Sequence, residues 1–156
     1  MKYLLYMVIV AVALSIPLER QDVAKLKPVE LVSVYTEGDQ VVLATDTKDI
    51  GVGKTLSQAY ENLELTTPGV IYLDTAQYLL ISDEALPWVP ELRGYLKENV
   101  ALCLQEGVLD PEMAVKYLSE QANLPKLKTW EEGVNMPILQ EYNKRLIFLE
   151  KSEKSS

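Results

Sequence analysis

The chain has 156 residues, of which 48% are apolar and 24% charged, and its formal net charge is −8. These values are typical of one folded globular domain and exclude a disordered chain. The acidic balance excludes a general nucleic-acid binder, which needs a basic surface against phosphate. The sequence has no histidine and one cysteine, Cys103, which excludes a Ser-His-Asp or Cys-His site, an intramolecular disulfide and a cysteine-rich zinc site.

The first 18 residues, MKYLLYMVIVAVALSIPL, have the pattern of an export signal. Lys2 precedes an uncharged run from Tyr3 to Ile16. A membrane-spanning helix needs roughly 20 apolar residues, whereas a signal-peptide core has ~7–15. We therefore expect residues 1–18 to be a cleaved signal peptide or an uncleaved short membrane anchor, and the third alternative is a buried helix or strand of the domain. The first two place the rest of the chain outside the cytoplasm, with membrane contact through residues 1–18 if they are uncleaved.

The segment after this run begins with a charged linker, predicted over residues 19–28. Apolar residues then alternate over 29–35 and again over 40–45, with a Glu-Gly-Asp turn between them. This pattern predicts a β-hairpin over residues 29–46. Residues 46–54 are predicted to be a loop, because two glycines interrupt them.

A helix is predicted to begin at Thr55, which has the spacing of a capping box with Gln58. Its apolar face recurs at helical spacing. The members of this face are Leu56, Ala59, Tyr60 and Leu63. Two short apolar runs follow, at 70–73 and 78–81, and the second has the stronger strand pattern.

The remaining elements are predicted from apolar spacing and helix caps. We expect a helix at about 88–98, a strand over 100–105, and a helix over 111–122 that Asp110 caps, with proline at its first position. A last amphipathic helix is predicted over 137–150. The residues that would form its apolar face are Ile138, Tyr142, Leu146 and Leu149.

Together these elements predict a single α+β domain over residues 29–150. The expected order is β-β-α-β-α-β-α-α, with a mixed sheet flanked by helices. Residues 151–156 are expected to be a frayed tail.

The stretch Gly51-Val52-Gly53-Lys54-Thr55 resembles a phosphate-binding loop, because it precedes a helix. That motif needs another glycine five residues before Gly53, where this chain has Lys48. We therefore predict a flexible glycine loop that leads into a capped helix, and no nucleotide or other cofactor.

Five carboxylates are candidates for acid–base chemistry or for a metal. A paired-carboxylate hydrolase needs two of them ~5–9.5 Å apart in a cleft, and the pattern Asp-x-x-Asp-x-Gly is a weak approximation to a calcium loop. Most of these side chains fall in predicted loops or on solvent faces, so we expect solvated charges and assign no catalytic, cofactor-binding or metal-binding residue. The five are Asp46, Asp49, Asp74, Asp83 and Glu84.

Nine tyrosines accompany a single phenylalanine. Tyr60, Tyr95 and Tyr117 lie on predicted inward faces, which favours a role in the core over an interaction surface. Cys103 lies within an apolar run, so we expect it to be buried as a small hydrophobic residue.

The stretch from residue 29 to about 122 resembles the N-terminal domain of the Ger(x)C spore-germination proteins, the C subunits of bacterial germinant receptors. The shared pattern is a hairpin, a glycine-containing loop into a helix, two apolar runs, and a strand that closes on a glycine before a short helix. In this sequence its residues are Gly53-Lys54-Thr55-Leu56-x-x-Ala59-x-x-x-Leu63, Thr67-Pro68, Ile71-Tyr72-Leu73, Tyr78 to Asp83, and Gly107.

The resemblance implies an extracytoplasmic, membrane-associated accessory domain without enzymatic activity. Ger(x)C proteins have several domains and a lipid anchor on a cysteine at the signal cleavage site, which this chain lacks. We expect an exported binding or assembly module at the outer face of the cytoplasmic membrane. Its partner would be a membrane protein or another extracytoplasmic protein, and the resemblance connects it to spore germination. The alternative is a small extracytoplasmic hydrolase that uses carboxylates without histidine.

Overall fold

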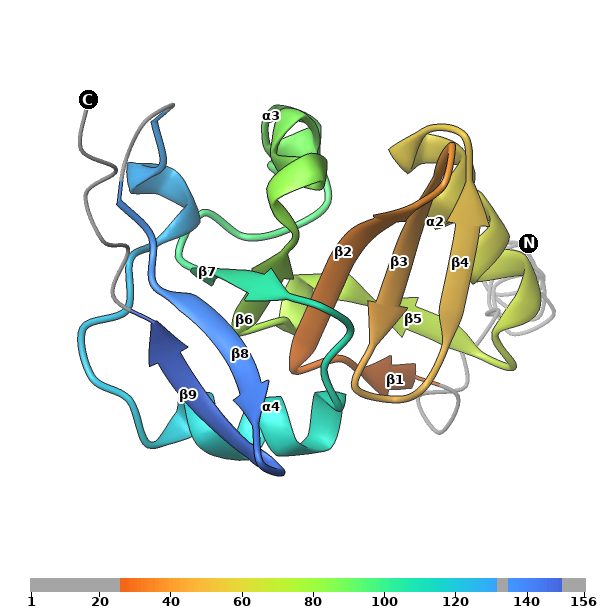
Figure 1. Cartoon of the computed structure of the whole chain (residues 1–156). Coiled ribbons are helices and arrows are strands. Elements are labelled where there is room, and N and C mark those ends of the chain that lie inside the picture. Colours follow the sequence, from red (N-terminus) through yellow and green to blue (C-terminus); the bar gives the residue numbers. More distant parts are fainter. Residues whose placement is uncertain (1–25, 132–134, 150–156) are drawn as a thin grey trace, which may run out of the picture.

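The computed structural model describes residues 26–131 and 135–149, which fold around one large β-sheet (Figure 1). The sheet has seven strands in the order β4-β3-β2-β6-β7-β8-β9, and β1 and β5 form a separate two-stranded sheet. The strands are β1 (Leu26–Pro28), β2 (Leu31–Glu37), β3 (Gln40–Thr45), β4 (Ile50–Gly53), β5 (Val70–Tyr72), β6 (Tyr78–Ile81), β7 (Ala101–Glu106), β8 (Ile138–Tyr142) and β9 (Arg145–Leu149).

The sheet is mixed, because its centre is parallel and its margins are antiparallel. Strands β2, β6, β7 and β8 pair in parallel, whereas β3, β4 and β9 pair antiparallel with their neighbours. The α-helices are α2 (Leu56–Thr66), α3 (Val89–Leu92) and α4 (Pro111–Ser119). This arrangement confirms the predicted α+β class and the mixed sheet flanked by helices.

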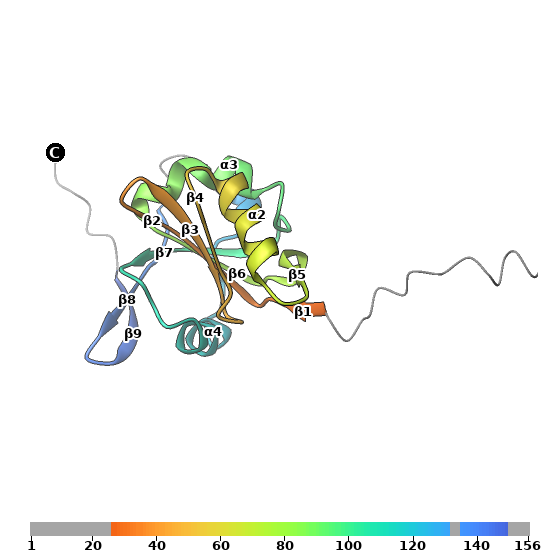
Figure 2. The same cartoon turned by 90° about the vertical axis from the view of Figure 1, so that its right-hand side faces the viewer.

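Helices cover both faces of the sheet, as Figure 2 shows with α2 and α3 on one side and α4 on the other. Each face has its own hydrophobic cluster, as the period-two alternation of a strand requires. On β2, Val32 and Val34 belong to the cluster under α2 and α3, whereas Leu31 belongs to the cluster on the α4 side. Burial on both faces explains why β6 and β7 are almost continuously apolar in sequence.

Several local predictions are confirmed. The hairpin over residues 29–46 forms from β2 and β3, and residues 101–106 form β7. Thr55 is the N-cap of α2, and its hydroxyl accepts a hydrogen bond from the backbone N–H of Gln58 at 3.2 Å. Asp110 caps α4 in the same way, accepting from the Met113 amide at 2.8 Å. These elements are local in origin, since caps and turns satisfy their own backbone groups.

The linker predicted over residues 19–28 is wrong at its C-terminal end. Leu26–Pro28 is strand β1, which pairs in parallel with β5. The Thr75 hydroxyl fixes the following residue, because its Oγ1 lies 2.8 Å from the Val29 nitrogen and 2.9 Å from the Val29 oxygen. The chain therefore enters the domain as an ordered strand. Residues 19–25, and the export signal predicted over 1–18, lie outside the described residues.

The loop predicted over residues 46–54 is confirmed for residues 46–49 and 54 and wrong for the rest, because Ile50–Gly53 is strand β4. It pairs antiparallel with β3 from Ile50↔Ala44 to Gly53↔Val41. Glycine has a low propensity for strands, but the close packing of helix α2 against these glycines outweighs that propensity.

The helix predicted at 88–98 lies earlier in the chain. Asp83–Trp88 is a 3-10 helix that continues into α3. The following helix is shorter than the predicted 111–122, since it ends at Ser119 and leaves Ala122 exposed.

The amphipathic helix predicted over 137–150 is wrong, because this segment is the β8–β9 hairpin. Its two-residue turn consists of Asn143 and Lys144, with φ of 51° and 61°. Both residues in the left-handed region indicate a type I′ turn, which matches the twist of paired strands. The observed order is therefore β-β-β-β-α-β-β-α-β-α-β-β, in place of the predicted β-β-α-β-α-β-α-α. The frayed tail predicted over 151–156 lies outside the described residues.

Candidate functional site

The glycines of the phosphate-loop-like motif lie in β4, directly against helix α2. A Cβ atom on Gly51 would overlap the Ala59 carbonyl oxygen and lie 2.6 Å from the Leu63 Cβ. A Cβ atom on Gly53 would lie 2.5 Å from the Ala59 nitrogen. Both glycines allow the helix backbone to approach the strand backbone closely, which explains the motif without a bound phosphate.

Side chains of α2 also bond the backbone of β4 and of the residue that follows it. The Val52 amide donates to Asn62 Oδ1 at 3.0 Å, and the Lys54 amide donates to Gln58 Oε1 at 3.1 Å. The Val52 and Lys54 amides, two of those that a phosphate in this loop would need, are therefore already bonded to the helix that covers this edge of the sheet.

The two aspartates of the calcium-like pattern have structural roles. Asp46 Oδ1 accepts from the backbone amides of Glu30 and Leu31 at 3.0 and 3.1 Å. Asp49 accepts from the Thr47 hydroxyl at 2.6 Å and forms an ion pair with Lys27 at 3.4 Å. Both carboxylates thus hold the chain where it enters β2.

The other three candidate carboxylates are exposed. Asp83 and Glu84 begin the 3-10 helix after β6. Asp74 lines a polar hollow of about 290 Å³ together with Lys97 and Lys126. Within residues 26–131 and 135–149, no three His, Cys, Asp or Glu side chains lie in an arrangement that could hold a metal ion.

The tyrosines predicted to face inward are half-buried and packed against the core. The rings of Tyr60 and Tyr95 lie 4.7 Å apart between centroids. Burial, with a hydrogen bond to Glu64, raises the pKa of Tyr60 to about 12. Tyr117 packs edge-on against Phe148 at 5.4 Å between centroids.

Cys103 is buried in β7, as predicted. Burial raises the pKa of its thiol to about 12. The thiol is therefore protonated at neutral pH and lacks the reactivity of a nucleophile.

A buried polar group lies on the α4 side of the central strands. The Ser33 hydroxyl donates to Gln105 Oε1 at 2.8 Å, joining β2 to β7 across β6. The Gln105 amide nitrogen and the Ser82 hydroxyl have no hydrogen-bond partner among the described residues. No sequence pattern predicted this group, because its members are far apart in the chain.

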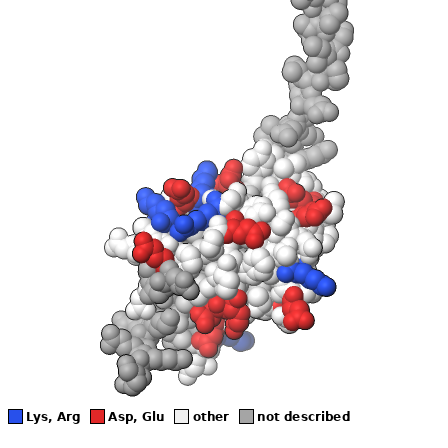
Figure 3. Space-filling view, turned by 90° about the horizontal axis from the view of Figure 1, so that it is seen from above, with Lys and Arg blue, Asp and Glu red and all other residues white. Residues whose placement is uncertain are grey.

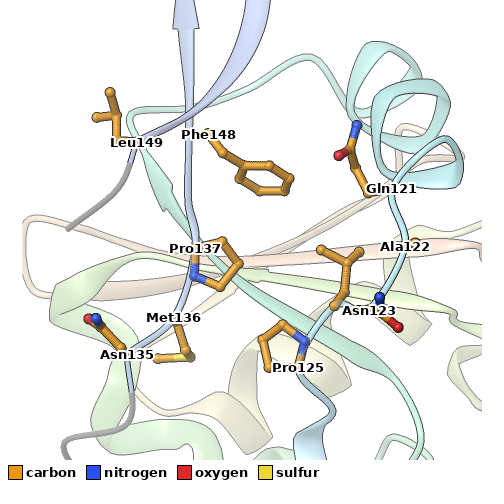
Figure 4. A pocket seen from close by; sticks show the side chains of 10 residues that line it. Gln121, Ala122, Asn123, Pro125, Asn135, Met136, Pro137, Phe148 and Leu149 are labelled. Atoms are coloured by element: carbon orange, nitrogen blue, oxygen red, sulfur yellow. The ribbon is translucent and has the colours of Figure 1, made fainter.

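A groove of about 570 Å³ lies between the segment after α4, the segment before β8 and the end of β9 (Figure 4). Phe148 points into it from β9. Its lining combines apolar side chains with amides and contains no carboxyl, amine, thiol or hydroxyl side chain. The lining residues are Gln121, Ala122, Asn123, Leu124, Pro125, Asn135, Met136, Pro137, Phe148 and Leu149. Such a surface can bind by shape and hydrogen bonds, but it offers no side chain for acid–base or nucleophilic chemistry.

Strand β9 forms the open edge of the sheet beside this groove. In an antiparallel pair, alternate residues turn their N–H and C=O groups away from the partner strand. Tyr142 and Arg145 close the hairpin turn as a bonded pair, so the outward groups of β9 belong to Leu146 and Phe148. Among residues 26–131 and 135–149, no backbone group outside β8 bonds to either of them.

Exposed apolar side chains also lie outside the groove. Ile50 and Leu65 are 51% and 79% exposed near the far edge of the sheet, but they line neither of the hollows described above. Acidic and basic side chains are interspersed on the face seen in Figure 3, as on an ordinary solvated surface. In the part of the chain that the structure describes, no helix has the length and apolar character needed to cross a membrane.

No family model, curated protein or solved structure matches this chain. The groove and the β9 edge are the candidate site, and their geometry is the basis for this assignment. Sequence patterns did not predict either, because residues 121–125, 135–137 and 148–149 come together only after β8 and β9 pair.

Proposed function

We propose that this chain is an exported binding or assembly module that works outside the cytoplasm and has no enzymatic activity. The observation that carries the proposal is the chemistry of the groove beside β9. Its lining residues supply apolar surface and amide groups but no acid, base or nucleophile. Such a hollow fits a partner rather than a reacting substrate.

The partner we propose is a membrane protein, as in a germinant receptor, of which the module would be an accessory domain. The resemblance to the Ger(x)C N-terminal domain is the basis for this partner. The hairpin over residues 29–46 and strand β7 support it, because the resemblance requires both elements.

The strand through which the chain enters the domain lies away from the groove. In Figure 2, strand β1 and strand β9 lie on opposite sides of the molecule.

The test is crosslinked capture of the tagged full-length chain from native membranes, followed by mass spectrometry of partners and of the mature N-terminus. Recovery with a multi-pass membrane protein, and with residues 1–18 either trimmed or in the membrane, is the expected result. Recovery from the cytoplasmic fraction without a partner would overturn the proposal.

The alternative hydrolase is tested on the same preparation. The purified chain is expected to leave ester, glycoside and peptide substrates unchanged. Turnover that disappears in a carboxylate-to-amide variant such as Asp83→Asn or Asp74→Asn would replace the binding module with the hydrolase.

A further inference from the structure

We propose that the β9 edge and the adjoining groove bind an extended, uncharged and apolar segment of the partner protein, which adds to the sheet as a strand next to β9. This inference rests on the proposed function and names the chemistry of the partner.

The backbone of β9 requires a partner that is itself extended. The outward N–H and C=O groups of Leu146 and Phe148 lie about two residues apart along the strand, a spacing of roughly 7 Å. An extended peptide presents complementary groups at the same spacing, whereas a helix or a bilayer presents none. Strand addition to an exposed edge is a general mode of peptide recognition.

The groove determines the side chains of that peptide. None of its lining residues is charged although the whole chain carries −8, so a charged segment would lose hydration there without gaining an ion pair. The sequence that follows β9 contains Glu150, Lys151, Glu153 and Lys154, which makes it a poor complement to this lining. Apolar side chains at alternating positions fit better, and Gln121, Asn123 and Asn135 offer amides to the peptide backbone.

The edge and the groove are parts of one surface. Phe148 supplies outward backbone groups to the edge and a side chain to the groove, and Leu149 ends the strand at the groove. A peptide that pairs with β9 and continues past its end therefore reaches the groove without a turn.

The first test uses purified full-length protein and a capped heptapeptide of alternating valine and threonine as the probe. Amide hydrogen exchange at Leu146 and Phe148 is expected to slow by about tenfold or more when the peptide saturates. The Ile147 amide, which faces β8, is the internal reference. A matched peptide with an N-methyl group on every backbone nitrogen cannot donate and is expected to have no effect. Unchanged exchange at both positions, or perturbation around Leu65 instead, would overturn the inference.

The second test uses a charge on the edge strand. Ile147 is half-buried and lies between the two residues with outward groups, so Ile147→Lys places a charge beside the incoming strand. It is expected to weaken peptide binding by about tenfold or more. Tyr142→Lys adds the same charge to β8 of the same hairpin, where the side chain is 63% exposed, and is expected to bind as the unchanged protein does.

Crosslinked capture from membranes separates the two proposals. Equal capture of a membrane partner by the unchanged chain and by Ile147→Lys would overturn the edge inference while the proposed function stands. Capture of no partner by the unchanged chain would remove the proposed function, and the peptide measurements would still decide the edge. A chain that sediments alone as a dimer and becomes a monomer on Ile147→Lys would assign the edge to a second copy and overturn the inference.

Discussion

At one end of the sheet, β4 lies under helix α2, whereas at the other end β9 has no strand or helix beyond it among the described residues. Both strands face the same physical problem, because an edge strand has backbone groups without a sheet partner. At the β4 edge, helix α2 covers the strand. Two glycines allow the helix backbone to approach closely, and side chains of α2 accept hydrogen bonds from backbone amides at this edge. Specific residues of this chain thus close the β4 edge, whereas no described residue outside β8 bonds to the backbone of β9.

The largest expected effect comes from removing the close approach at the covered edge. Gly51→Ala places a methyl group against the backbone of α2, so we expect the free energy of unfolding to fall by about 3 kcal/mol or more. Denaturant unfolding measures it. Gly94→Ala is the control, because its Cβ would meet only the Glu91 oxygen at 3.3 Å. Equal midpoints for the two variants would show that the glycine at 51 is not needed for packing.

A smaller loss is expected from the turn that holds the open edge. Asn143→Val forces a β-branched residue to a φ of 51°, which should cost about 1–2 kcal/mol. Asn143→Gly is the matched control and should retain the stability of the unchanged chain, since glycine adopts this conformation freely. Equal free energies of unfolding for Asn143→Val and Asn143→Gly would show that the type I′ turn does not stabilise the hairpin.

Loss of one hydrogen bond between α2 and β4 should have a smaller effect again. Asn62→Leu leaves the Val52 amide without its acceptor, and we expect a loss of about 1 kcal/mol. Asn62→Asp retains an oxygen at the same position and should lose less. The amide exchange rate of Val52 reports the bond directly, and a rate that Asn62→Leu does not increase would contradict its role in covering the edge.

The smallest expected effect is a pH dependence of the free energy of unfolding, which arises from Tyr60 on helix α2. The pKa of Tyr60 rises from 10.0 to about 12 on folding, so the protonated phenol contributes stability below pH 10 that is lost as the pH rises from 10 towards 12. Tyr60→Phe should remove this component from the alkaline unfolding curve. The thiol of Cys103 also has a pKa of about 12. It is present in the unchanged protein and in Tyr60→Phe, so its contribution cancels when the two unfolding curves are subtracted. Identical alkaline curves would show that Tyr60 contributes none of this dependence.

The elements that sequence patterns predicted correctly are those whose causes are local. Thr55 and Asp110 cap helices through groups three residues away, and the hairpin over 29–46 is fixed by alternation and a turn. The errors arise where a distant element decides. Residues 50–53 are a strand because α2 packs on their glycines, and that contact is invisible in a local pattern.

The misassigned C-terminal helix has a different cause. Ile138, Tyr142 and Leu146 recur at helical spacing, but the side chains that are deeply buried are Leu139 and Leu146 on opposite strands. The turn at Asn143 decides between the two patterns, and its sequence lacks the glycine that would have indicated it. The same error hid the candidate site, because the groove and the open edge exist only once β8 and β9 are paired.

The strand order has a consequence for how the chain acquires its structure. After the β2–β3–β4 unit, strands β6, β7, β8 and β9 occupy successive positions outward in the order in which they occur along the chain. No later strand has to insert between two earlier ones. Because synthesis proceeds from the N-terminus, each new strand can be added to an edge that has already formed. This order allows the sheet to grow strand by strand during synthesis. In this sequence of events, β9 is the last addition, and the edge it leaves is where growth by another chain would continue.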